Sequence, residues 1–427
     1  MLHNRYINTS KNAGGIVIPV IVLAGIGILM IYSSSVLISE EKYGSGFHYL
    51  WRHLFTILIG FSTMIFLAKV DYLKLRGFII PLLIFSFVLL ILVFVPGIGV
   101  SAGPQSEVKR WIKLWPSTFQ PSELTKITVV LFLADYMSKN IYKMKSLRYG
   151  VIIPFAVVAV FQGIILLQPD FGGAVHIGII TLALLFIGGI KWRHVFGIIL
   201  LALPIFYSLV LSAPYRMKRI MAFLNPWQDP QGAGFQLVQS FLAFGRGGLT
   251  GVGIGDSKQK LFFLPEAHTD FIFSLIGEEI GLLGVLTVLG LFLWLFIKGF
   301  RMAMRTEESF GYYLALGLTI MIGSQALMNF AVSTGLMPTK GLPLPFVSYG
   351  GSAFLVNAAA VGILINIAKN CRGKFSLSSE RVKHRATSLK GLTKDKATTE
   401  YMSFPGSELG AGRTRRAETA SRRRRYR

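Results

Sequence analysis

The sequence has few charged residues and almost no cysteine. Only 15% of its 427 residues are charged, against about a quarter in an average soluble protein. The single cysteine, Cys371, excludes a disulfide framework or a cysteine metal site within one chain. Among the charged residues the acidic ones are the fewer, with 20 Asp and Glu against 44 Lys and Arg, which gives a formal net charge of +24. The low charge excludes an ordinary soluble domain.

Long apolar runs take the place of the missing charges. Mean hydropathy is +0.57, and apolar runs near the ~20 residues needed to cross a bilayer recur along the chain. The sequence predicts an all-α, polytopic membrane protein with about ten transmembrane helices and a long outward loop between the seventh and eighth spans. The expected spans are Ile16–Ile38, Leu50–Ala68, Phe78–Val100, Ser122–Tyr136, Val151–Leu167, Gly172–Ile190, Val195–Ser212, Phe271–Ile297, Tyr312–Val332 and Ser352–Ala368.

Short basic loops predict the orientation. KVDYLKLR, SKNIYKMKSLR, KWRH and KGFRMAMR follow every second span, so the positive-inside rule places them and both termini in the cytoplasm. The expected order is a cytoplasmic N-terminus (1–15), a transmembrane domain (16–368) with a large extracytoplasmic loop (213–270), and a basic disordered tail (369–427). The tail holds 17 Lys and Arg against 5 Asp and Glu, so we expect it to contact anionic lipid rather than nucleic acid.

Two outward segments have unusual composition. Residues 213–270 form the longest loop and are rich in Gly and aromatic residues, with the pattern NPWQDPQGAGFQ. Residues 333–351, STGLMPTKGLPLPFVSYGG, carry Gly and Pro that forbid a plain helix. Long loops rarely lack a role, and irregular backbone at membrane depth survives only when it is buried in protein or lines a cavity. Both segments are therefore candidates for a site.

Asp270 lies where a polar stretch, with Glu266 and His268, becomes an apolar helix pattern. Partial desolvation there disfavours the charged form of a carboxylate and raises its pKa. Such a group accepts a proton well near neutral pH. The alternative is that Thr269 or Asp270 caps the helix that follows. Glu278, further along this helix, either borders the same cavity or hydrogen-bonds within the bundle.

Polar residues inside other spans are costly and therefore informative. Glu123 and Lys126 are spaced i, i+3 and can pair on one helix face, with Ser122 as the expected N-cap. The preferred interpretation is a structural ion pair, and the alternative is a direct catalytic role for Glu123; a buried pair that lines a cavity could serve both. Two further polar features have structural interpretations: Gln325 and Asn329 as a stripe that joins helices, and Asp170 as a turn or cap.

Basic residues in the outward loops run against the positive-inside trend. Solvated surface charge is the simplest explanation for most of them. A cluster that faces one cavity would instead bind an anion such as a diphosphate. The candidates for binding the substrate or its diphosphate are Lys109, Arg110, Arg216, Arg246 and Lys340, together with His268 and Glu266 near Asp270.

Four stretches carry a resemblance to a known family. QPSELTK, NPWQDPQGAGFQ, GVGIGDSKQKLFFLPEAHTDFIFSLIGEEIGLLG and GLMPTKGLPLPFVSYGG resemble the signatures of the SEDS family (shape, elongation, division and sporulation), which includes FtsW, RodA and SpoVE. The likeness covers roughly residues 16–368, and TKGLPLPF is closest to the FtsW branch. The resemblance implies a peptidoglycan glycosyltransferase that polymerises lipid II at the outer face of the inner membrane during cell division. It implies that Asp270 is the catalytic residue and that Glu123 and Lys126 form an ion pair beside a central cavity.

The resemblance also implies partners and a mechanism. A class B penicillin-binding protein would add the crosslinks, other divisome proteins would join at the septum, and undecaprenyl diphosphate would leave. Asp270 would take the proton of the GlcNAc 4-hydroxyl, and a single displacement would invert the anomeric centre. Basic residues, or a divalent cation (Mg or Mn) held by the phosphates, would neutralise the leaving group.

Two other classes of protein compete with the enzyme. A lipid II flippase would suit the intramembrane charges and the broken outward segment, but a carrier places ionisable residues near the midplane. A scaffold that only recruits division proteins would leave Asp270 and the outward bases without a role.

Overall fold

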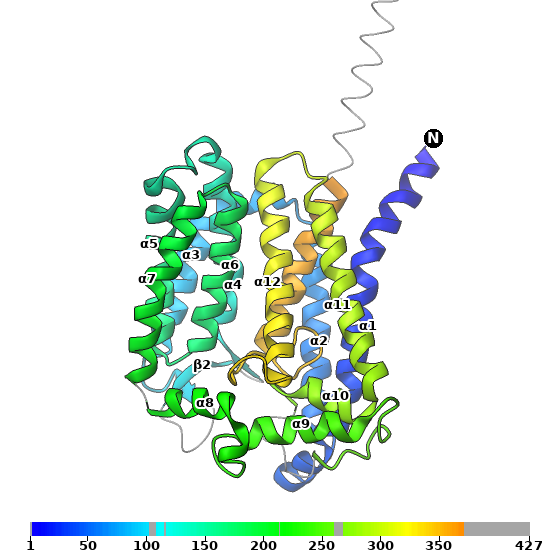
Figure 1. Cartoon of the computed structure of the whole chain (residues 1–427). Helices are drawn as coiled ribbons and strands as arrows, with labels where there is room; N and C mark the ends of the chain where they lie inside the picture. The colour runs from blue at the N-terminus through cyan, green and yellow to red at the C-terminus, as the bar shows by residue number, and fades with distance from the viewer. Residues whose placement is uncertain (1, 102–107, 115–116, 213, 260–267, 371–427) are drawn as a thin grey trace, which may run out of the picture. The chain divides into compact units, whose positions relative to one another are not determined.

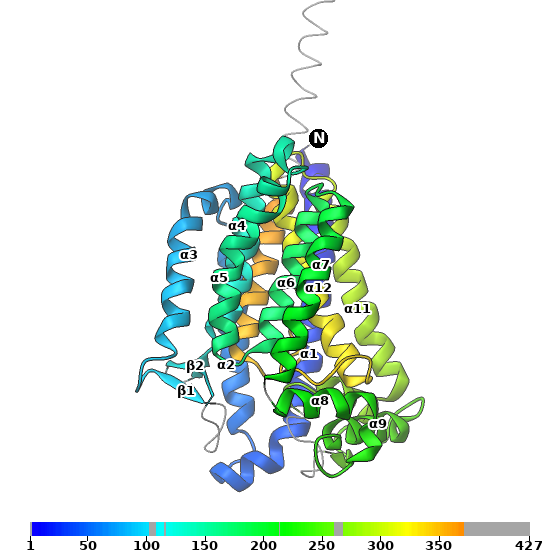
Figure 2. The same ribbon diagram turned by 60° about the vertical axis from the view of Figure 1, so that its left-hand side comes forward.

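The computed structural model of the chain describes residues 2–101, 108–114, 117–212, 214–259 and 268–370, without the side chains of residues 2–13, 37 and 117. The long helices of this part of the chain stand side by side (Figures 1 and 2). Glu266 and residues 371–427, which include Cys371 and all but the first two residues of the predicted tail, lie outside the described residues. The interpretations given to them stay predictions. The compact unit described below belongs to the first 372 residues.

Each expected span corresponds to a long helix. The ten helices are α1 (Leu2–Tyr43), α2 (His48–Leu67), α3 (Leu75–Leu92), α4 (Pro121–Lys139), α5 (Ile153–Leu167), α6 (Phe171–Ile187), α7 (Trp192–Leu211), α11 (Gly281–Ala303), α12 (Ser309–Ser333) and a final unlabelled helix, Gly351–Asn370. Within the described residues, eight helices are long and apolar enough to cross a membrane on their own. The other two are α6, which is shorter, and α4, which carries buried charges.

Helix α12 and the final helix form the centre of the bundle. In the apolar 18-residue stretch of each of these two helices, 72% and 78% of the residues are buried, against 17% in the corresponding stretch of α7. The exposed residues of α7 are mostly large and apolar, including Phe196, Leu201 and Tyr207, as expected of a helix that faces lipid. The central helices therefore carry the polar groups that join neighbouring helices, and the outer helices provide the apolar surface.

The predicted eighth span is wrong at its start. Residues Ile272–Glu279 form a short separate helix, α10, and the long helix α11 begins only at Gly281. Gly281 has a φ of +73°, which a side chain rarely adopts. Backbone groups of the preceding loop close the break, because Val252 N donates to Glu278 O (3.0 Å) and Leu282 N donates to Gly248 O (3.0 Å).

Gly281→Ala should destabilise the protein. An added Cβ would lie 2.4 Å from Gly251 N, and the positive φ would be strained, so the free energy of unfolding should fall by roughly 2–5 kcal/mol. The measurement is thermal or denaturant unfolding in detergent. Gly197→Ala, on exposed α7 with nothing within 4 Å, is the matched control and should be neutral or slightly stabilising. Equal stability of the two variants would contradict the expectation that a side chain at residue 281 is strained and crowded.

The short helices of the long loop, α10 and the small sheet lie at one end of the bundle (Figure 1). Helix α1 begins and the final helix ends at the opposite end, where the short basic loops also lie (Figure 1). That end includes the one-turn helices η1 (Tyr72–Lys74) and η2 (Ile141–Lys143) and the wider turn η3 (Arg148–Ile152). The end with α8, α9 and α10 is called the outward end below, following the orientation predicted from loop charge.

The long loop of the outward end is built from short helices. They are α8 (Pro214–Leu224), η4 (Pro226–Gln228) and α9 (Phe235–Gly247). The predicted third span, Phe78–Val100, ends as a helix at Leu92 and leads into a sheet of β1 (Gly99–Ser101), β2 (Lys109–Leu114) and β3 (Ser117–Phe119). This antiparallel sheet, ordered β1-β2-β3, is a small exception to the all-α prediction.

Candidate active site at the outward end

The segment 334–350, between α12 and the final helix, is the irregular backbone around which the site forms. Its residues Leu342, Leu344, Phe346 and Val347 are buried. Their backbone is held from α12, because Gln325 donates to Pro343 O (2.9 Å) and Asn329 donates to Leu342 O (2.9 Å). The prediction that Gln325 joins helices is confirmed, because it also accepts a hydrogen bond from Lys126 of α4. Asn329 instead holds this segment and the backbone of Asp270.

Asp270 lies between this segment and α10. Its backbone oxygen accepts a hydrogen bond from Asn329 Nδ2 (2.8 Å), and its Oδ2 is 3.6 Å from the position that a Cβ of residue 341 would take. The residue is half-buried, so it is not sealed off from the outward end. The N-cap residue of α10 is Phe271, whose side chain makes no capping hydrogen bond. The N-cap position predicted for Thr269 or Asp270 is therefore wrong.

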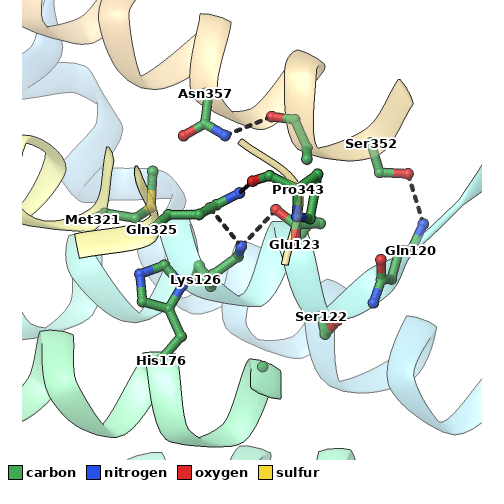
Figure 3. A network of polar contacts seen from close by, with 12 residues as sticks. Gln120, Ser122, Glu123, Lys126, His176, Met321, Gln325, Pro343, Ser352 and Asn357 are labelled. Carbon is green, nitrogen blue, oxygen red and sulfur yellow. Dashed lines mark hydrogen bonds and ion pairs between the residues drawn. The ribbon is translucent and has the colours of Figure 1, made fainter. Parts of the chain in front are cut away.

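The Glu123–Lys126 pair is buried in the bundle, and Figure 3 shows Lys126 in contact with both Glu123 and Gln325. Lys126 Nζ is 2.7 Å from Glu123 Oε2, and the two side chains are only 2% and 3% exposed. Lys126 also donates to Gln325 Oε1 (2.9 Å). Because Gln325 in turn donates to Pro343 O, the ion pair supports the segment that reaches Asp270. The predicted pair is confirmed, and its contacts are structural.

Lys126→Met should be strongly destabilising. It leaves the Glu123 carboxylate buried without its partner and removes the donor to Gln325, and breaking a buried pair costs about 3–5 kcal/mol. Glu123→Gln/Lys126→Met removes both charges and should regain most of the stability. Both variants are compared by thermal unfolding in detergent. A double variant no more stable than the single one would contradict this account.

The N-cap that the sequence predicted for α4 is wrong. The N-cap of α4 is Gln120 rather than Ser122. The Ser122 hydroxyl donates instead to Asp170 Oδ2 (3.0 Å), while Asp170 Oδ1 accepts from Gly173 N (2.9 Å) at the start of α6. Ser122 loses the capping position because Pro121 occupies N1 of α4. The predicted capping role of Asp170 is confirmed.

Four basic side chains gather around the start of α6, and we call them the cation cluster: Arg110, Arg216, Arg219 and Lys340. Arg110 donates to Gln168 O (3.1 Å) and Pro169 O (2.6 Å). The Arg216 guanidinium lies 5.7 Å from the Phe171 ring centroid and donates to Leu209 O (2.6 Å). The Cβ of Lys340 lies 3.6 Å from the Cβ position of residue 172. Burial lowers the pKa of Lys340.

Arg219 connects the cation cluster to Asp270 and was not selected from the sequence. It donates from Nη1 to Thr339 O (3.2 Å). Its pKa is lowered chiefly by partial burial and also by Arg110, whereas Tyr215 and Asp270 raise it. Arg110 and Asp270 therefore both lie within electrostatic range of this guanidinium. Its position among the basic residues of the long loop was the only signal in the sequence.

Other predicted site residues lie elsewhere or serve the fold. Arg246 Nη1 is 3.7 Å from Glu278 Oε1, so Arg246 pairs with a buried carboxylate and does not join the cation cluster. Glu278 also accepts from the Ser257 hydroxyl and from Lys258 N (3.3 Å), which confirms its predicted role as a hydrogen-bonding group of the bundle. Lys109 is an exposed residue of β2.

His268 belongs to a group of aromatic rings beside Asp270. Its ring centroid is 5.7 Å from that of Tyr49 and 5.8 Å from that of Tyr349. Its backbone oxygen accepts from Tyr349 N (2.9 Å). This contact ties the residues before Asp270 to the end of the 334–350 segment. His268 therefore lies next to the candidate site, as predicted, with its ring against aromatic neighbours.

The described residues contain no group of three or more His, Cys, Asp or Glu side chains that could hold a metal ion. The predicted alternative of a divalent cation placed that ion on the phosphates of the substrate. The raised pKa expected for Asp270 also stays a prediction.

Ten long helices around a buried ion pair, with a half-buried carboxylate and a cation cluster at one end, define a polytopic membrane protein with a candidate catalytic site at that end. The sequence matches the family of cell cycle proteins that comprises FtsW, RodA and SpoVE over residues 15–373, and the chain belongs to this family. The resemblance drawn from the four sequence stretches is therefore confirmed.

Relatives and solved structures agree with this assignment. A probable peptidoglycan glycosyltransferase FtsW of Geobacter metallireducens is 42% identical and covers 84% of this chain and 95% of the relative. Stage V sporulation protein E of Bacillus subtilis is 40% identical and covers 84% and 97%. A chain of a peptidoglycan synthase complex that coordinates polymerisation and crosslinking is similar in structure, with a TM-score of 0.68 and 29% identity over 84% and 98%. RodA of Thermus thermophilus has a TM-score of 0.61 and 26% identity over 84% and 97%.

Proposed function

We propose that the chain is a peptidoglycan glycosyltransferase that polymerises lipid II at the outward end, with Asp270 as general base. The observation that carries the proposal is the position of Asp270. It is half-buried at the outward end, beside the 334–350 segment and within electrostatic range of Arg219. A base for the hydroxyl of one substrate, Asp270, thus lies close to cations that can bind a diphosphate.

In the reaction, Asp270 takes the proton of the GlcNAc 4-hydroxyl of the acceptor lipid II. The oxygen of that hydroxyl forms a bond to MurNAc C1 of the growing glycan, while the bond from C1 to the diphosphate oxygen breaks. A base is needed because the pKa of a sugar hydroxyl is far above neutral pH. One direct displacement inverts the configuration at C1, giving a β-linked product from an α-linked donor.

The leaving group is undecaprenyl diphosphate, which needs neutralisation of its charge rather than a proton. Lys340 is the best-placed cation because it is adjacent in sequence to Gly341, against which the Asp270 carboxylate lies. Arg110 and Arg216 flank the same start of α6 and add positive potential. A divalent cation on the phosphates would add to the same neutralisation.

The buried ion pair is proposed to position this site. Glu123 and Lys126 reach the 334–350 segment through Gln325, and Asn329 holds both that segment and the backbone of Asp270. A carboxylate held from several elements keeps the geometry that proton transfer requires.

The cellular setting is part of the same proposal. We expect a class B penicillin-binding protein to crosslink the strands, with other divisome proteins at the septum. Both termini are expected in the cytoplasm, where the basic tail would contact anionic lipid.

The test is polymerisation by the purified chain with its transpeptidase partner. Fluorescent lipid II is supplied, and the length of the glycan strands is read on a gel. The proposal expects strands of many disaccharides. A chain that moves lipid II across vesicle membranes but makes no glycan would instead be a flippase, and a chain that does neither would support the scaffold.

A further inference from the structure

A second cationic feature at the outward end adjoins the cation cluster and shares Arg219 with it. An open cavity of about 360 Å³ is formed by α8, the loop before α9, the start of α9 and Thr339. Its polar lining includes Lys218, Arg219, Gln231 and Gln236. At about 30 Å³ for each water molecule, the volume is that of about twelve waters, enough for a diphosphate with part of a sugar.

The charges of the cavity indicate an anionic ligand. None of the described residues that line it is acidic, and two of them are basic. The nearby carboxylate of Asp229 is turned toward the backbone, where its Oδ2 accepts from Ala233 N (2.9 Å). Guanidinium, ammonium and side-chain amide groups are all donors to phosphate oxygens.

The surroundings of the cavity indicate that the anion is attached to a lipid. Helix α8 exposes Met221 and Leu224, which are 52% and 69% exposed, on the helix that carries Lys218 and Arg219. Helix α7, which leads into α8, exposes Tyr207 and Leu211 near its outward end. An amphipathic helix of this kind lies at the membrane interface, the depth at which a lipid diphosphate is found.

We propose that this cavity binds the diphosphate of the acceptor lipid II. The inference rests on the proposed function and follows from the shapes of the two substrates. The donor diphosphate is bonded to the reacting C1, so it must lie beside Asp270, where Lys340 is placed. The acceptor presents the GlcNAc 4-hydroxyl to Asp270, so its own diphosphate lies two sugar rings away. Arg219 connects the two positions, because it donates a hydrogen bond to Thr339 O and is within electrostatic range of Asp270.

The test varies the two substrates separately in the complex with the transpeptidase partner. A lipid II with a blocked GlcNAc 4-hydroxyl acts only as donor, and an analogue with a methylene in place of the anomeric oxygen acts only as acceptor. One donor-only molecule and one acceptor-only molecule together form a single glycosidic linkage. Lys218→Gln and Arg219→Gln should each raise KM for the acceptor about tenfold, the loss of one charge-assisted contact, with the donor KM changed less than about twofold. Arg219→Lys should recover part of the affinity.

The outcomes separate this inference from the proposed function. Lys42→Gln, an exposed lysine in the last turn of α1, is the control and should leave both KM values unchanged. A rise in the donor KM, an equal rise in both, or no rise in either would overturn the acceptor assignment while the enzyme remained active. No linkage formed by the wild-type chain would refute the glycosyltransferase itself. An unchanged donor KM in the variants also shows that they are folded.

Discussion

Asp270→Asn is expected to lower the rate of glycan polymerisation by about 100- to 10,000-fold, the usual contribution of a general base. Asparagine keeps the size of the side chain but cannot take up a proton at neutral pH. The backbone contact from Asn329 to the oxygen of residue 270 does not depend on the carboxylate, so the fold should be retained. The measurement is the initial rate of lipid II consumption by the purified complex, with thermal unfolding as the check on folding.

A second carboxylate provides the control for this variant. Asp256 is exposed in the loop after α9, at the same end of the molecule. Asp256→Asn should retain the wild-type rate, because the effect depends on position and not on the number of acidic groups. A similar loss in both variants would mean that general outward charge, rather than a base at residue 270, supports the reaction.

Lys340→Gln is expected to lower kcat by about 100- to 1,000-fold, the range found when one group that stabilises developing charge is removed. The leaving diphosphate gains negative charge as its bond to C1 breaks, so the loss should fall on kcat more than on KM. Lys258→Gln, an exposed lysine of the loop after α9, should be near wild type. A rise in KM with unchanged kcat would instead assign Lys340 to ground-state binding.

The lowered pKa of Lys340 also predicts how the activity depends on pH. Burial lowers its pKa, so the side chain is charged below that pKa and becomes neutral at a lower pH than a free lysine would. Activity should therefore be present at neutral pH and fall as the pH rises through the lowered pKa. Lys340→Arg keeps its charge to a much higher pH, so this alkaline fall should disappear in that variant if Lys340 causes it.

The apolar pattern of the sequence predicted the helices well because lipid imposes a simple rule on a span. Each expected segment corresponds to a long helix, and the spacing of Glu123 and Lys126 predicted a pair that the fold buries. The break at Gly281 was missed, because the apolar pattern continues through it and only the backbone geometry of Gly281 ends α10. Periodicity carries no information on such a local φ.

The basic residues were harder to assign because a loop gives no spatial register. Arg216 and Arg246 looked equivalent in the sequence, yet one lies against Phe171 at the start of α6 and the other pairs with Glu278. Arg219 was passed over although it contacts Thr339 within the 334–350 segment. These contacts join residues that are far apart in the sequence, 120 positions in the case of Arg219 and Thr339, and only the folded chain brings them together.

The most direct measurement is single-turnover bond formation between the donor-only and acceptor-only substrates, followed as a function of pH. For the wild-type complex we predict a rate that falls tenfold per pH unit on the acid side, as one carboxylate becomes protonated, and a β-linked product. Asp270→Asn should bind both substrates with wild-type affinity yet form the bond at least about 100-fold more slowly, without that acid limb. Bond formation by Asp270→Asn at the wild-type rate would contradict the account.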